Sequence, residues 1–520
     1  MKAAAAHPEK SPPDVAIIDE VTSVVRSHPG VHDVAVYRQS DSEIVGFVVP
    51  QEKYVDEVLG GREAEGTLLR RWRKTYDLSQ LTKAAATSEF AFNIAGWNSS
   101  YTRQPLPAEH MQEWVQTTVD RIATLAPTEV LEIGCGTGLL LLRLAPNCKR
   151  YRGTDFATSV IRNLKAQLSL AKGLSSKVEV LERSANDFGG LAAHSFSTVI
   201  LNSSAQYFPS RSYLERVIEN ALGVVRPGGH IFIGDMRNFV LQRVQEASIE
   251  SFQAGSDLKV ADVRERVDSR VHQEHELVPS PGYFLTLTHK FPQISRVDIY
   301  PRRGLFDNEM TRFRFDAILW IGGSTNPMPI EFFDPPHRGW DLKQIRSRLN
   351  GHKGKGMGFA RILNSRIERD VELCERLATA APDGLFSELR NEIEERPLRG
   401  IHPEAIFRLA AESGYRVAIS WAACYPNGSY DAVFVRKSEG QAFPTIDWPQ
   451  PSAQSLVRLS SMPAQSAVHD KLVGELISHC RIKLASEAVP KHVCLVDSIP
   501  YREGHTVDYE ALLSATRLPR

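Results

Sequence analysis

Three alternating glycines followed by one acidic residue are the residues of this sequence whose types and spacing could bind a nucleoside-bearing ligand. Gly134, Gly136 and Gly138 come directly after residues 129–133, which read as a short buried strand. Alternating glycines let the backbone turn tightly and let a ligand approach it closely, and the helix expected after them would offer free N–H groups. Asp155 lies where the second strand of a βαβ unit would end, so its side chain is placed to bind a ribose diol. Strand, glycine turn, helix and acid together are the context that this kind of motif requires.

Two ligand classes fit this pattern, a dinucleotide and S-adenosylmethionine (SAM). The dinucleotide fingerprint G-x-G-x-x-G needs its third glycine one residue later than Gly138, and this chain has E-x-G-x-G-x-G instead. Glu132, near the end of the first strand, would meet a cationic or amino-bearing ligand rather than a pyrophosphate. We therefore expect SAM, whose methionyl end carries an ammonium and a sulfonium, and we assign Phe156, next to Asp155, to the same site. A dinucleotide oxidoreductase, and a turn whose glycines serve packing alone, are the alternatives.

The composition limits the class of protein. The 520 residues indicate roughly two to four domains. Lys and Arg number 62, as do Asp and Glu, so no electrostatic footprint for nucleic acid is expected. No stretch approaches the roughly 20 apolar residues that a membrane helix needs. The six cysteines show no paired metal-ligand spacing, so we expect no metal site and a reducing, cytoplasmic environment.

Apolar segments that alternate with helical segments predict the fold class. Five strands are expected at residues 130–133, 151–156, 178–181, 197–202 and 229–234. This alternation is the pattern of an α/β protein with a doubly wound, Rossmann-like parallel sheet. Two further strands, at residues 297–304 and 313–319, are expected as an antiparallel pair at one edge. The glycine- and lysine-rich residues 351–359 are expected to form a mobile basic loop.

Several polar side chains follow the expected strands, at the edge where ligand sites open in such sheets. Asn202 ends the fourth strand, and its backbone carbonyl is expected to bind the methionyl amine. Tyr207 comes next, on the substrate side, although a core tyrosine is as good an interpretation. Asp235 follows the fifth strand, and Asn308 and Glu309 lie between the last two. Asp235 and Glu309 are the acids expected near a substrate amine, with solvated loop acids as the alternative.

Outside this sheet, the two ends of the chain complement each other. Residues 14–50 read as helix, strand and strand, and residues 467–513 as helix, strand, turn and helix. Together they resemble the small C-terminal subdomain of nonribosomal peptide synthetase adenylation domains, split by a long insertion. The stretches that carry the likeness are residues 27–36, 45–50, 489–490, 498–500 and 507–508.

The insertion resembles the methyltransferase domains embedded in adenylation domains of peptide synthetases. The likeness rests on residues 93–102, 201–209, 234–237, 308–316 and 429–434, in family order. It implies a disordered tail at 1–13, subdomain parts at 14–58 and 461–520, a methyltransferase at 66–438 and a linker at 439–460.

The resemblance also implies further cofactor-binding residues. Asn186, Asp187 and Phe188 follow the third strand, and the corresponding stretch of the family lies beside the adenine; a helix cap with a core aromatic is the alternative. Trp97 and Tyr101 precede the sheet on a helix or lid. Their aromatic faces could cover the sulfonium through cation–π contact, whereas a simple core role is equally open.

The likeness breaks at the last turn of the split subdomain. The family has a lysine there that serves acyl-adenylate formation, and this chain has Thr506, which cannot supply a cation. The nucleotide-binding core that normally precedes the subdomain does not fit into the first 50 residues. The resemblance without these parts predicts a chain lacking adenylation activity.

The function that these observations predict is SAM-dependent methyl transfer in nonribosomal peptide or related biosynthesis. We expect N-methylation of an amino acid or peptidyl amine held as a thioester on a carrier protein, or of a small-molecule amine, because methyltransferases inserted at this point resemble N-methylating ones. An O- or C-methyltransferase is one alternative. A non-catalytic docking scaffold that binds SAM weakly is another.

Overall fold

The structure is a computed structural model that describes residues 12–40, 43–58, 60–83, 92–94, 96–171, 173–323, 326–438, 442–461, 463, 466–502 and 506–516. The chain divides into two compact units. A small unit comprises residues 1–68, 452–459 and 464–520, and a large unit comprises residues 69–451 and 460–463. The tail predicted at residues 1–13 lies outside the described residues as far as residue 11. Helix α1 already begins at Pro12, because proline is tolerated in the first turn of a helix.

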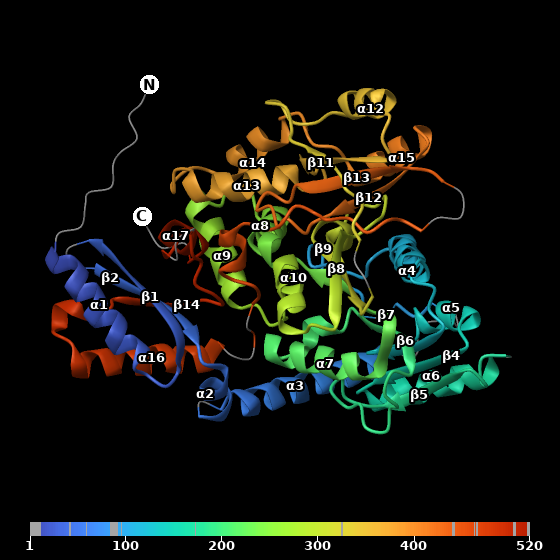
Figure 1. Cartoon of the computed structure of the whole chain (residues 1–520), viewed down its shortest axis with the longest axis horizontal. Coiled ribbons are helices and arrows are strands. Elements are labelled where there is room, and N and C mark those ends of the chain that lie inside the picture. The colour runs from blue at the N-terminus through green and yellow to red at the C-terminus, as the bar shows by residue number, and fades with distance from the viewer. Residues whose placement is uncertain are drawn as a thin grey trace. The chain divides into compact units, whose positions relative to one another are not determined.

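The large unit is built on a seven-stranded sheet in the order β5-β4-β3-β6-β7-β9-β8 (Figure 1). Strands β3 to β7 are parallel, and β9 runs antiparallel to both β7 and β8. The predicted α/β class with a doubly wound sheet is confirmed. The strands are β3 (Glu129–Ile133), β4 (Arg150–Asp155), β5 (Val178–Glu182), β6 (Phe196–Asn202), β7 (Val225–Arg237), β8 (Ile294–Pro301) and β9 (Arg314–Ile321).

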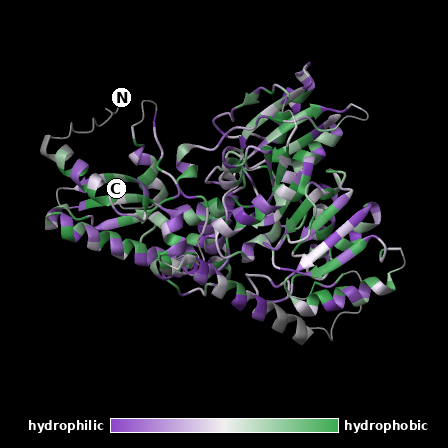
Figure 2. Ribbon diagram, turned by 60° about the horizontal axis from the view of Figure 1, so that its bottom comes forward, coloured by the Kyte–Doolittle hydropathy of each residue, from purple (hydrophilic) through white to green (hydrophobic). Residues whose placement is uncertain are grey.

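The helices between and after these strands bury apolar faces against the sheet or, for α8 and α9, against the later helices α13 (Glu368–Thr379) and α14 (Phe386–Glu394). They are α4 (Ala108–Ala123), α5 (Leu141–Leu144), α6 (Thr158–Leu170), α7 (Arg211–Val224), α8 (Gln242–Gln253), α9 (Val260–His272), α10 (Pro281–Lys290) and α11 (Glu309–Arg312). Short 3₁₀ helices are η1 (Ala145–Asn147), η2 (Ala205–Tyr207) and η3 (Phe239–Leu241). Strands carry long apolar stretches, whereas many helices alternate between polar and apolar residues (Figure 2). No helix in the described part of the chain is both long and apolar enough to cross a membrane.

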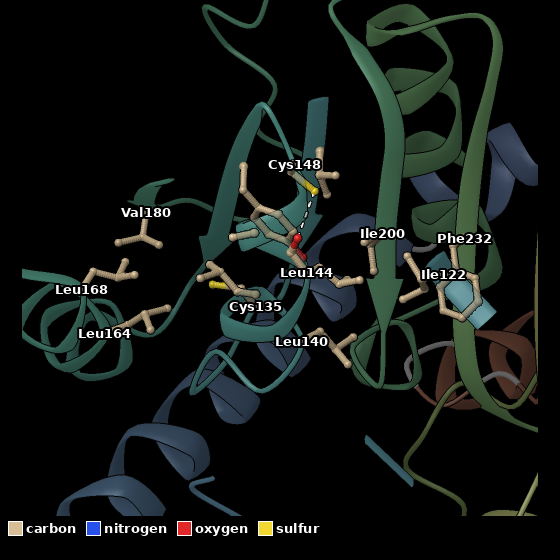
Figure 3. Packing of buried hydrophobic residues seen from close by; sticks show 14 of the residues in the cluster. Ile122, Cys135, Leu140, Leu144, Cys148, Leu164, Leu168, Val180, Ile200 and Phe232 are labelled. Carbon is tan, nitrogen blue, oxygen red and sulfur yellow. Dashed lines mark hydrogen bonds between the residues drawn. The ribbon is translucent and has the colours of Figure 1, made fainter. Parts of the chain in front are cut away.

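A cluster of buried side chains supports the turn that follows β3. Every residue of β6 is buried, as expected for a central parallel strand that is covered on both faces. Around Cys135 the cluster has two sides: Leu164, Leu168 and Val180 on one, and Ile200, Phe232 and Ile122 on the other (Figure 3). The glycine turn therefore rests on a packed core.

The helix expected directly after the glycines is present but short. Helix α5 spans Leu141–Leu144 and passes into η1, which contains Pro146. Proline removes a backbone donor and clashes with the preceding turn, so an α-helix ends before it. The donation of N–H groups from this helix N-terminus to a ligand stays a prediction.

A second, four-stranded sheet of the large unit has the order β10-β11-β13-β12. Its strands are β10 (Phe332–Phe333), β11 (Gly356–Ile362), β12 (Tyr415–Ser420) and β13 (Tyr430–Arg436), with helices α12 (Leu342–Gly351), α13 (Glu368–Thr379), α14 (Phe386–Glu394) and α15 (Pro403–Glu412). The prediction of a loop over residues 351–359 is wrong from residue 356 onward. There the chain pairs antiparallel with β13, and this pairing overrides the low strand propensity of glycine.

The small unit combines segments from both ends of the chain. Its sheet has the order β1-β2-β14, with β1 and β2 antiparallel and β14 parallel to β2. The elements are α1 (Pro12–Arg26), β1 (Val31–Ser40), β2 (Glu43–Pro50), α2 (Glu52–Glu57), η4 (Ala453–Leu456), α16 (Ser466–Lys483), η5 (Ser486–Ala488), β14 (His492–Leu495) and α17 (Tyr509–Thr516). Helix α3 (Gly61–Lys83) continues from the small unit into the large one.

Candidate active site

All three glycines of the turn after β3 need the conformational freedom that glycine has. Gly134, Gly136 and Gly138 have φ values of 77°, 50° and 84°, in the left-handed region. A Cβ at Gly134 would lie 2.6 Å from the Cβ of Ser204, and one at Gly138 would lie 2.7 Å from Leu164. The turn is thus closely surrounded, and its bare backbone forms one wall of the candidate site.

Asp155, at the end of β4, is tied to this turn. Its side chain is buried, and its Oδ2 accepts a hydrogen bond of 3.0 Å from the Gly136 amide. Its Oδ1 accepts a hydrogen bond of 2.9 Å from the Ala157 amide, just before α6. The acid predicted to bind the ribose therefore lies beside the glycine turn, as the βαβ interpretation requires. Phe156 follows it and is half-buried.

Glu132 is buried inside the sheet beside the turn. The Tyr151 hydroxyl donates a hydrogen bond of 2.8 Å to its Oε2. Burial is the main cause that raises the pKa of Glu132 to about 8, with the nearby charge of Asp155 adding to the shift. Since a neighbouring cation favours the ionised form, this carboxyl group is suited to respond to an ammonium-bearing ligand.

The segment that follows β6 holds two buried acceptors without partners. The Asn202 amide donates from Nδ2 to Ser203 Oγ over 3.1 Å, which leaves Oδ1 buried and unpaired among the described residues. Gln206 Oε1 is likewise buried and has no hydrogen-bond partner there. Buried polar groups are nearly always paired, so these two oxygens indicate a place for a donor-rich ligand. Ser204 donates to the carbonyl of Ile133, which brings this segment against the glycine turn.

Together, the glycine turn, the acids at positions 132 and 155 and the unpaired acceptors fit SAM. The bare turn admits the nucleoside, Asp155 suits a ribose diol, and the unpaired oxygens suit an ammonium group.

Asp235, predicted as an acid near the substrate, is occupied by other side chains. Trp114 Nε1 donates to its Oδ1 over 3.0 Å, while Ser203 Oγ and Arg314 Nη1 each donate to its Oδ2 over 2.6 Å. Its side chain is 0% exposed. Both Asp235 and Ser203 have positive φ, at 61° and 52°, and such strain persists only where surrounding contacts hold it. Asp316 extends the network by accepting from the Asp235 amide.

Glu309 and Asn308 also have structural contacts. Glu309 is buried and accepts from Ser99 Oγ at 3.0 Å, from the Ser100 amide at 2.9 Å and from Ser100 Oγ at 3.0 Å. Asn308 caps α11, because its Oδ1 accepts from the Met310 amide. These contacts fasten the segment at residues 99–100 to the loop between β8 and β9.

Trp97 and Tyr101 lie on a turn closed by the bridge between Asn98 and Pro105, not on a helix. The Trp97 ring packs on Trp114 with 4.7 Å between centroids. The Tyr101 hydroxyl donates to Ser248 Oγ over 3.0 Å, and burial raises its pKa to about 12. Both aromatics thus have protein partners. The Trp114 ring that Trp97 packs on is also the one whose Nε1 donates to Asp235.

Residues 186–188 follow β5 and make local contacts. Asn186 and Asp187 are exposed and Phe188 is half-buried. The Gly189 amide donates to Asp187 Oδ1 over 3.0 Å, an arrangement typical of an Asx turn.

Tyr207 is half-buried at the end of η2, and its ring packs on Trp72 of α3 at 4.9 Å. Burial raises its pKa, and the strongest charge acting on it is Glu276. Reasoning from the sequence did not single out Trp114, Ser203 or Glu276, whereas Gln206 was expected beside Tyr207 on the substrate side. Their importance depends on contacts between distant segments. The one local sign in the sequence was the pair of glutamates at positions 274 and 276, which marks an acidic loop.

The sheet order, the glycine turn and the acid after β4 define a SAM-dependent methyltransferase domain. Residues 131–231 match the family model described as "Methyltransferase domain". The predicted enzyme class and cofactor are confirmed. Among the described residues, no cluster of His, Cys, Asp and Glu could hold a metal ion.

The chain is homologous over nearly its whole length to segments of nonribosomal peptide synthetases, which confirms the resemblance seen in the sequence. It is 36% identical over 514 residues to chondramide synthase of Chondromyces crocatus, covering 95% of this chain and 13% of that protein. It is 30% identical to a probable non-canonical nonribosomal peptide synthetase of Salinispora arenicola, covering 95% of this chain and 6% of the relative. This chain therefore spans a small part of these relatives.

Among solved structures, the N-methyltransferase NodS from Bradyrhizobium japonicum is 16% identical. It matches with a TM-score of 0.26 over 41% of this chain and 97% of that one.

Proposed function

We propose that this chain N-methylates an amino acid or peptidyl amine that is held as a thioester on a carrier protein of a peptide-synthetase assembly line. The observation that carries the proposal is the extent of the homology. The alignment with peptide synthetases covers 95% of this chain, which means that it includes both parts of the split small unit as well as the methyltransferase. A methyltransferase embedded in this way supports a carrier-bound substrate over a free metabolite.

In this proposal the cofactor is held by the glycine turn, by Asp155 at the ribose and by Glu132 and Asn202 toward the methionyl end. Residues 186–188 are assigned to the adenine, and Trp97 and Tyr101 to the cover of the site. Bound SAM supplies an electrophilic methyl group on its sulfonium, and the carbon–sulfur electron pair remains on sulfur when the methyl group leaves.

The protein's own task is to hold the acceptor in line and to leave it a lone pair. Placement of this kind can lower a barrier by several kcal/mol. An α-amino group titrates near pH 8, so an aminoacyl amine is already partly neutral in a cell. The unpaired Gln206 Oε1 can only accept a hydrogen bond, which favours an N–H donor over a carbon acceptor on the substrate side.

The residues predicted to act on the substrate have different contacts, and we assign their roles accordingly. Tyr207 faces the acceptor from η2. Asp235 and Glu309 each already accept three hydrogen bonds, so they position the segments around the site. Asn308 contributes through its cap on α11.

We further propose that the small unit does not form acyl adenylates. Thr506 stands where the family has its lysine, and the Arg502 amide donates to the Thr506 carbonyl over 2.8 Å. Among the described residues of this turn, Arg502 supplies a cation, and its guanidinium pairs with Asp508 and Glu510 at 2.9 and 3.3 Å. A threonine side chain cannot replace a lysine opposite a carboxylate and a phosphate.

The test is incubation with SAM and aminoacyl-loaded carrier proteins, read by intact mass. We expect the mass of one methylene to be added for each methyl group transferred to the amine. Matched substrates that carry a hydroxyl in place of the amine separate N- from O-methylation. No gain on any amine substrate would refute the proposal. SAM affinity of the wild type and of Asp155→Ala separates an enzyme from a silent scaffold, since a scaffold should show no difference.

A further inference from the structure

Arg237 lies at the end of β7 and faces more negative charge than it can neutralise. Its guanidinium pairs with Glu246 at 2.9 Å, Glu274 at 2.6 Å and Glu276 at 3.2 Å. Arg270 pairs with the same Glu246 at 2.7 Å. Arg270 also contacts Glu250 at 3.4 Å, so four carboxylates share these two guanidinium groups.

Within this group, Glu276 is the carboxylate that is held least. Its contact with Arg237 is the longest of the three, and Arg237 is its one side-chain donor among the described residues. Its side chain is 26% exposed, compared with 12% for Glu274 and 7% for Glu246. Glu274 has a second donor in Gln242 Nε2 at 3.3 Å.

Glu276 also lies against the segment that follows β6. The amide of Leu277 donates to the carbonyl of Gln206 over 2.7 Å, which brings the loop before α10 to η2. Gln206 carries one of the two unpaired buried oxygens, and the charge of Glu276 acts on the Tyr207 hydroxyl. The loop that carries Glu276 therefore lies beside the segment that carries Gln206 and Tyr207, and a partly exposed carboxylate near an unpaired carbonyl oxygen suits a cationic amine.

We propose that Glu276 is the group that contacts the acceptor amine and removes its proton before methyl transfer. The proposal rests on the amine substrate proposed above. In this step an N–H bond of the ammonium breaks and its electron pair stays on nitrogen. The proton forms an O–H bond on the Glu276 carboxylate and later passes to solvent. Arg237 keeps the carboxylate oriented through its other oxygen.

The surroundings of Glu276 raise its pKa above the ordinary value for a glutamate, which makes its carboxylate a stronger base. Burial is the main cause that raises its pKa, and Glu274 adds to the increase, while Arg237 and Arg314 lower it. Tyr207 on η2 also lies within the influence of the Glu276 charge, and Glu246 on α8 shares Arg237 with Glu276. A general base is most effective when its pKa lies close to the operating pH.

The test compares Glu276→Gln with the matched variant Glu274→Gln. An amine that titrates near pH 8 is about one-tenth neutral at pH 7, so loss of the group that takes its proton can cost up to about tenfold in kcat/KM there. We expect a loss approaching this size for Glu276→Gln at pH 7 that shrinks toward parity above pH 8–9, where the amine is neutral without help. Glu274→Gln removes the shorter contact to Arg237, so a purely structural role predicts equal or greater damage from it. A pH-dependent loss confined to Glu276→Gln supports the proposal, and equal losses in both variants overturn it.

A second readout does not depend on turnover. Calorimetry without SAM measures the affinity for an aminoacyl thioester of N-acetylcysteamine and for its desamino analogue. We expect the wild type to prefer the amine, and Glu276→Gln to lose that preference while keeping its affinity for SAM. If the wild type methylates no amine, the proposed function fails. Equal affinities for the two thioesters in the wild type would then overturn the role of Glu276 separately.

Discussion

Replacing Glu132 with glutamine removes a buried titratable group while it keeps an oxygen that can accept from the Tyr151 hydroxyl. The pKa of this carboxyl is raised from 4.5 to about 8, mainly because it is buried. A tenfold change in proton affinity corresponds to about 1.4 kcal/mol, so this difference places the upper limit of the effect near about 5 kcal/mol. We therefore expect Glu132→Gln to stabilise the unliganded protein at pH 8.

The sign follows from the proton balance of the two states. Below pH 4.5 the carboxyl group is protonated in both the folded and the unfolded chain, and the substitution changes little. Between pH 4.5 and 8 the unfolded chain ionises while the folded chain keeps its proton, so the wild type loses stability as the pH rises. Above pH 8 both states are ionised and the difference stays constant. Glu132→Gln lacks this loss.

The assay is urea unfolding at pH 5, 6, 7 and 8, with amide exchange of β3 reporting on the opening of the large unit. Glu129→Gln, on the same strand, is the matched control. The Glu129 carboxylate accepts a hydrogen bond from Thr128 and pairs with Arg226, and both contacts lower its pKa. The wild type should therefore gain stability relative to Glu129→Gln as the pH rises through the acidic range. A difference between wild type and Glu132→Gln that does not vary from pH 5 to 8 would refute the reasoning. Glu132→Gln should also bind SAM more weakly than the wild type, because it has no carboxylate to pair with the ammonium group of SAM.

Three further outcomes are expected. Gly138→Ala places a methyl group 2.7 Å from a leucine side chain of α6 at a φ of 84°, so it should cost about 1–3 kcal/mol and weaken SAM binding, as measured by denaturant unfolding and calorimetry. Asp235→Asn leaves the buried Arg314 without its anion and should cost about 3–5 kcal/mol in thermal unfolding; a change below 1 kcal/mol would mean that the pair contributes little. Glu309→Ala removes the acceptor of three hydrogen bonds, so limited proteolysis should cut faster around residues 99–100 while far-UV circular dichroism stays unchanged.

The seven-stranded sheet could be predicted because its strands are short apolar runs between clear turn signals, and because a glycine turn with an acid one strand later has few other uses. The apolar run at residues 139–142 indicated the start of a helix, and α5 is present there, but its end at Leu144 depends on Pro146. The strand at residues 356–362 was missed. Its glycines argue for a loop, and only pairing with β13 makes it a strand.

The site was harder to predict than the fold. Asp235 and Glu309 were singled out because loop acids at a carboxyl edge suit chemistry, but their partners come from distant segments. Arg314 reaches Asp235 because β9 runs antiparallel to β7, with Arg237 opposite Arg314. One sequence does not specify that register. Glu276 escaped notice because nothing local distinguishes it from Glu274; the difference lies in which of them Arg237 holds more loosely.

The pairing of β2 with β14 means that two strands of one sheet are synthesised at very different times. Roughly 440 residues separate Pro50 from His492, and closing a flexible loop of that length costs about 5 kcal/mol. At ribosomal speeds of about 5–20 residues per second, the nascent β1–β2 hairpin waits on the order of a minute before its third strand exists. During that time the free edge of β2 can recruit other chains. If the large unit folds first, it replaces most of that flexible loop with a compact domain. Folding of the large unit would then lower the entropy cost of pairing β2 with β14 and so assist the folding of the small unit.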